Sequence, residues 1–154
     1  MEYSLELEGG KGLLLQIDKS LSLPVRRLLS SILRDAIQTI KSTPKEVSSN
    51  CFYFNLHDLY PHLDLDTGYH DSIDMISSLF QATTKTTLIW FHGDEENNRI
   101  YDGWAPLIGE ISWFDEKWWM QYCVPSRVFE GLKDKIIAPW ITSCLEKTPF
   151  PKMI

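Results

Sequence analysis

Residues 25–40 carry the pattern that most narrows the folds open to this chain. Apolar side chains recur there every three or four positions, as one face of an α-helix requires; they are Val25, Leu28, Leu29, Ile32, Leu33, Ala36, Ile37 and Ile40. Ser22 is a suitable helix cap, Pro24 suits a first helical turn, and Pro44 ends the element near Ser42. The sequence therefore predicts a long amphipathic helix whose apolar face other elements must cover.

A hairpin is predicted before this helix, over residues 2–18. Apolar and polar residues alternate from Tyr3 to Glu8, the period of a half-buried strand. The segment 9–12 contains three glycines, which suit a tight turn, and Leu13 to Ile17 form the returning strand.

A second hairpin is predicted over residues 107–124, with its turn at 114–117. This register places Trp113 opposite Trp118. Alternation assigns one face to the core, and its residues are Ile111, Trp113, Trp118, Met120 and Tyr122. The opposite face mixes rings with charges and consists of Glu110, Ser112, Phe114, Lys117, Trp119 and Gln121.

The remaining elements complete an α+β order. We predict strands over Cys51–Leu56 and Thr86–Phe91, and a helix over about Ser72–Ala82. A last helix from Ser126 to Lys147 contains Pro139, which lacks the N–H that a continuous helix needs, so a kink or two short helices are expected there. Because tight hairpins flank the helices, the predicted fold is a single α+β domain over residues 1–154, with a mainly antiparallel sheet and about three helices packed on it.

Composition limits the kinds of partner. The chain of 154 residues has a net charge of −6, which argues against nucleic acid and anionic membrane surfaces as partners.

The acidic N-terminus does not resemble a signal peptide, so a cytoplasmic location is expected. Cys51, Cys123 and Cys144 are widely spaced and are predicted to be buried, reduced thiols. No metal or cofactor is predicted, and the oligomeric state is left open.

The segment from Trp90 to Trp119 combines tryptophans with unbalanced acids. It holds five of the six tryptophans and seven acids against two bases, so it carries five of the six excess negative charges. Rings beside carboxylates suit a docking surface for a basic protein. The predicted contact residues are Asp94, Glu95, Glu96, Tyr101, Asp102, Trp104, Asp115, Glu116 and Trp119.

Three groups of residues leave enzymatic alternatives open. The segment 57–71 is rich in histidine and aspartate, but its spacing fits no zinc, iron or calcium template. Asp66-Thr67-Gly68 spells the aspartic-protease tripeptide without the strand that such a site needs. His92 and Asp94 follow a predicted strand, where catalytic groups often lie. No catalytic residue is assigned from these patterns.

In general make-up the chain resembles bacterial toxin-immunity proteins, which are small, acidic, aromatic-rich and cytoplasmic. The resemblance implies a protein that neutralises a basic, nuclease-like toxin domain by direct binding. On this hypothesis the acids steer association, whereas Tyr101, Trp104 and Trp119 anchor the complex. The alternatives are a small enzyme with a histidine and aspartate site, with or without a metal, and a regulatory domain that binds an acyl or peptide ligand.

Overall fold

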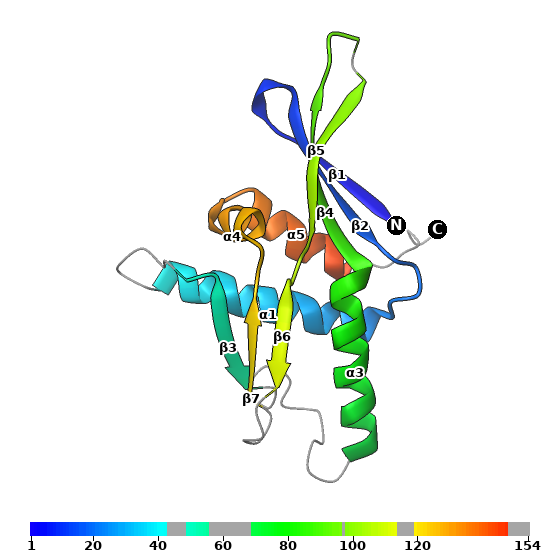
Figure 1. Ribbon diagram of the computed structural model, residues 1–154, viewed down its shortest axis with the longest axis vertical. Coiled ribbons are helices and arrows are strands. Elements are labelled where there is room, and N and C mark those ends of the chain that lie inside the picture. The colour runs from blue at the N-terminus through cyan, green and yellow to red at the C-terminus, as the bar shows by residue number, and fades with distance from the viewer. Residues whose placement is uncertain (43–48, 56–68, 97, 114–118, 148–154) are drawn as a thin grey trace, which may run out of the picture.

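The computed structural model describes residues 1–42, 49–55, 69–96, 98–113 and 119–147. Within them the chain forms two antiparallel sheets and four α-helices around one hydrophobic core (Figure 1). This confirms the predicted α+β class. The described helices exceed the predicted three because the last predicted helix divides in two.

The four-stranded sheet has the strand order β1-β2-β4-β5, and every neighbouring pair is antiparallel. Its strands are β1 (Glu2–Glu6), β2 (Lys11–Ile17), β4 (Thr86–Gly93) and β5 (Arg99–Pro106). The predicted first hairpin is confirmed. A short 3-10 turn, η1 (Glu8–Gly10), joins β1 to β2, and Gly9 and Gly10 adopt φ values of 75° and 73° that disfavour other residues.

The three-stranded sheet has the order β3-β7-β6, with β3 (Cys51–Asn55), β6 (Glu110–Trp113) and β7 (Trp119–Cys123). Trp113 lies opposite Met120, so the predicted pairing with Trp118 is wrong by two residues. A shift of two preserves the side-chain faces, and Met120 and Tyr122 are buried as predicted. Because residues 114–117 contain no preferred turn pair, local sequence does not set this register.

Helix α1 (Leu23–Ser42) confirms the long predicted helix and lies behind the three-stranded sheet in Figure 1. It packs against α3 (Tyr69–Lys85), α4 (Ser126–Lys133) and α5 (Ile137–Glu146). Arg26 of α1 is 2% exposed, and its Nη1 donates hydrogen bonds to the carbonyl oxygens of Leu145 and Lys147 at 3.3 and 2.7 Å. These bonds tie α1 to the C-terminal end of α5, where unpaired carbonyls favour a cation.

The last predicted helix is interrupted between Lys133 and Ile137, before Pro139. Oδ1 of Asp134 accepts hydrogen bonds from the backbone N–H groups of Ile136 and Ile137 at 2.8 and 3.0 Å. The bonds from Ile137 and then Ile136 lower the pKa of Asp134, so this carboxylate stays ionised at the start of α5. Pro139 falls in the first turn of α5, where its missing N–H costs little. Asp134 therefore follows the last residue of α4, and its carboxylate binds the backbone N–H groups at the start of α5.

Cys51 and Cys123 form a disulfide between β3 and β7, so the prediction that all three cysteines are reduced is wrong for this pair. Their separation of 72 residues gives no local signal, and only the antiparallel register brings them opposite each other. Cys144 is free and buried, as predicted, and burial raises the pKa of its thiol.

Candidate functional site

A β-bulge in β5 decides how the aromatic residues of the β4–β5 hairpin are presented. Trp90 pairs with Gly103, but the next residue, Phe91, pairs with Tyr101, so Asp102 is an extra residue in β5. Tyr101 and Trp104 are three positions apart and would point to opposite faces of a regular strand. The bulge instead places both on the same face.

This face of the four-stranded sheet, which we call the outer face, can be followed across the strands through their pairing. One row runs from Trp104 through Ile89 and Leu14 to Ser4. The next runs from Tyr101 through Phe91 and Gly12 to Glu6. The opposite face includes Leu13, Leu15 and Leu88, which belong to the core.

The two β5 rings on the outer face are strongly exposed. Trp104 is 77% exposed and Tyr101 is 59% exposed. Beside them, the Phe91 ring covers Gly12, where a Cβ would overlap the ring, and the Arg99 guanidinium lies 4.6 Å from the ring centroid. Figure 1 shows this hairpin extending past the helices, so a partner would have free access to it.

The predicted acids Asp94, Glu95 and Glu96 lie at the turn of the same hairpin. The Asp94 carboxylate accepts hydrogen bonds from the backbone N–H groups of Glu96 and Asn98 at 2.9 and 2.7 Å. It therefore orders the turn. Glu95 and Glu96 are exposed, and among the described residues no lysine or arginine pairs with either. Their charges are available to a partner.

The bulge residue Asp102 contacts a histidine. Both carboxylate oxygens of Asp102 lie 2.9 Å from Nδ1 of His92, and each side chain is 42% exposed. The contact joins β4 to β5 at the bulge, so the Asp102 side chain is positioned by His92.

Trp119 does not join the other predicted contact residues. It begins β7, opposite Asn55, at the end of the three-stranded sheet away from the β4–β5 hairpin (Figure 1). It is 43% exposed on the same face as Tyr53, which is 60% exposed. Asp115 and Glu116 lie outside the described residues.

Sequence reasoning missed the contribution of β1 to the outer face. Glu2 and Glu6 are exposed there, and neither forms an ion pair with another described residue. Nε2 of Gln16 donates a hydrogen bond of 2.8 Å to Glu2. The alternation in β1 signals an exposed side for both glutamates, but the strand order is what places them on the sheet face that carries Trp104.

No protein-family model matches the sequence, and no curated protein is significantly similar to it. Among solved structures, the chain is similar to the WH1 domain of MSBI1.176, a replication protein isolated from a multiple sclerosis patient. The identity is 16%, the TM-score is 0.47, and the match covers 82% of this chain and 84% of the other. A likeness at this level carries no argument about function.

The metal-dependent alternative can be compared with the described part of the chain. It contains no group of three or more histidine, cysteine, aspartate or glutamate side chains arranged to hold a metal. The segment 57–68, with the Asp66-Thr67-Gly68 tripeptide, lies outside the described residues.

None of the described helices has the length and apolar character needed to span a membrane.

Proposed function

We propose that this protein is a small acidic inhibitor of the immunity or antitoxin type, which binds a basic, nuclease-like protein domain. The observation that supports the proposal is the pair of exposed rings, Tyr101 and Trp104, on one sheet face beside glutamates that have no cation partner among the described residues. Aromatic anchors next to uncompensated carboxylates match the chemistry of a lysine-rich and arginine-rich surface.

The parts of the surface have separate roles in this proposal. Glu95 and Glu96, at the end of the hairpin, attract the partner at long range and raise the association rate. Tyr101 and Trp104 lose water on contact and slow dissociation. Glu2 and Glu6 extend the anionic area across the sheet to β1, so the contact reaches both edges of the four-stranded sheet.

The test begins with capture of binding proteins from the native host, using the full chain as bait, and measures the kinetics of the captured partner. We expect Trp104→Ala to raise the dissociation rate by roughly thirtyfold, because a desolvated tryptophan anchor contributes about 2 kcal/mol or more. The double reversal Glu95→Lys/Glu96→Lys should slow association by about tenfold at low salt, with a smaller effect at high salt.

Two matched controls separate this site from the rest of the surface. Trp119→Ala removes another exposed tryptophan on the three-stranded sheet and should leave dissociation unchanged. Glu110→Lys/Glu130→Lys changes the net charge equally away from the outer face and should slow association less. A partner that responds to Trp119→Ala and ignores Trp104→Ala would place the interface elsewhere. Capture of an acidic partner would contradict the proposal itself.

A further inference from the structure

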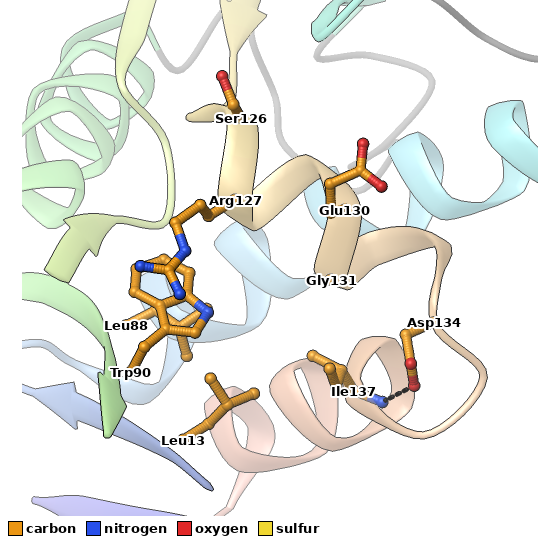
Figure 2. A pocket seen from close by; sticks show the side chains of 9 residues that line it. All are labelled: Leu13, Leu88, Trp90, Ser126, Arg127, Glu130, Gly131, Asp134 and Ile137. Carbon is orange, nitrogen blue, oxygen red and sulfur yellow. Dashed lines mark hydrogen bonds between the residues drawn. The ribbon is translucent and has the colours of Figure 1, made fainter. Parts of the chain in front are cut away.

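A cleft lies on the side of the four-stranded sheet opposite the outer face, between β2, β4 and the α4–α5 pair (Figure 2). Its volume is about 410 Å³, within the range of small-molecule sites. Leu13, Leu88, Trp90 and Ile137 provide apolar lining. The polar groups around it come from Ser126, Arg127, Glu130 and Asp134.

Arg127 is the charged side chain that lies over this apolar lining. Its guanidinium carbon is 4.3 Å from the centroid of the Trp90 ring, and Figure 2 shows the two groups stacked. A Cβ at Gly103, the strand partner of Trp90, would be 3.2 Å from Nη1 of Arg127. The absence of a side chain at Gly103 therefore leaves room for the guanidinium in this position.

The carboxylates at the rim are engaged elsewhere. Glu130 points away from Trp90 in Figure 2 and lies 3.6 Å from Nζ of Lys133. The carboxylate of Asp134 faces the backbone N–H groups of Ile136 and Ile137. Among the described residues, no carboxylate pairs with Arg127. Its guanidinium N–H groups remain available to an external anion.

We propose that this cleft binds a small monocarboxylate with an apolar body, its carboxylate on Arg127 and its apolar part against Trp90 and Ile137, the partly exposed members of the apolar lining. A planar guanidinium matches a carboxylate in two parallel hydrogen bonds, which are stronger than neutral ones. The negative charges of Glu130 and Asp134 at the rim select a ligand with one negative charge over a dianion such as phosphate. This site is separate from the outer face and does not depend on the proposed inhibitor function.

The direct test uses octanoate as the probe and calorimetric titration of the full-length protein. Octanoate should bind with one-to-one stoichiometry. Three related compounds should each bind at least about tenfold more weakly than octanoate. Octanol lacks the charge, acetate lacks the apolar body, and octyl phosphate carries a larger charge. N-acetyl-leucine also has a carboxylate and an apolar side chain, but it adds an amide next to the carboxylate, as the C-terminus of a peptide does. Comparing its affinity with that of octanoate therefore distinguishes a peptide C-terminus from a free small acid as the ligand. Failure of the wild-type protein to bind either carboxylate would overturn the proposal.

The variants test the role of Arg127. Arg127→Gln should weaken octanoate binding by about tenfold or more, and Arg127→Lys should retain part of the affinity. Arg99→Gln is the matched control, because Arg99 also lies over an aromatic ring but outside this cleft, and it should have no effect. Equal binding by wild-type protein and Arg127→Gln would refute the assignment. Should Arg127→Gln fail to fold, NMR of the wild-type protein decides, since octanoate must then shift the Trp90 indole N–H resonance and leave that of Trp119 in place.

Discussion

Replacing Cys51 and Cys123 with serine is expected to lower the free energy of unfolding by about 4 kcal/mol. The disulfide joins β3 to β7 across 72 residues, and a cross-link over so long a segment strongly restricts the unfolded chain. The measurement is urea denaturation of the oxidised wild-type protein and of the double-serine variant at neutral pH.

Reductant provides the control for this prediction. Dithiothreitol should destabilise the wild-type protein by a similar amount and leave the double-serine variant unchanged. Thiol titration of the unfolded, unreduced protein should detect one thiol, from Cys144, among the three cysteines. Detection of three thiols would contradict the disulfide. The cytoplasmic location stays a prediction, and the disulfide weighs against it because reducing compartments keep cysteine thiols reduced.

Replacing Tyr122 with alanine is expected to lower the free energy of unfolding by about 3–5 kcal/mol, because it leaves a cavity between the three-stranded sheet and α1. Tyr122 is fully buried, and its ring centroid lies 5.5 and 5.4 Å from those of Phe52 and Phe54. Its hydroxyl donates a 3.0 Å hydrogen bond to the carbonyl oxygen of Ile32. Tyr122→Phe keeps the ring and removes only this bond, so it should cost about 1 kcal/mol.

The same pair of proteins gives a pH-dependent result. Burial, and next the Asp35 carboxylate, raise the pKa of Tyr122 above its ordinary value of 10.0. The folded state therefore holds this proton more tightly than the unfolded state does. The resulting stabilisation is fully present below pH 10.0 and is lost as the pH rises above it. The advantage of the wild-type protein over Tyr122→Phe should shrink in alkaline denaturation experiments.

Tyr101→Phe is the matched control for the alkaline experiment, because Tyr101 is 59% exposed. This variant should follow the wild-type stability across the whole pH range. An alkaline loss of stability as large in Tyr122→Phe as in the wild-type protein would show that Tyr122 is not the group responsible. Unchanged stability of Tyr122→Ala at neutral pH would contradict the packing itself.

The candidate site was only partly predictable from the sequence. Composition drew attention to the 90–119 segment, in which Tyr101 and Trp104 are exposed, and their roles in binding stay predictions. The same argument grouped Trp119 with these rings, although it lies on another sheet. Closeness in sequence does not imply a shared surface when the chain passes from one sheet to another.

The sequence by itself determined the elements whose signals are local. Helix α1 and the β1–β2 hairpin follow from apolar periodicity and glycine placement within short windows, where the backbone geometry of the element imposes the spacing. Only the tertiary structure decided the β5 bulge at Asp102, the Cys51–Cys123 pairing and the position of Arg127 over Trp90. Each of these depends on which distant segments lie side by side, and that choice is made by packing the whole core at once.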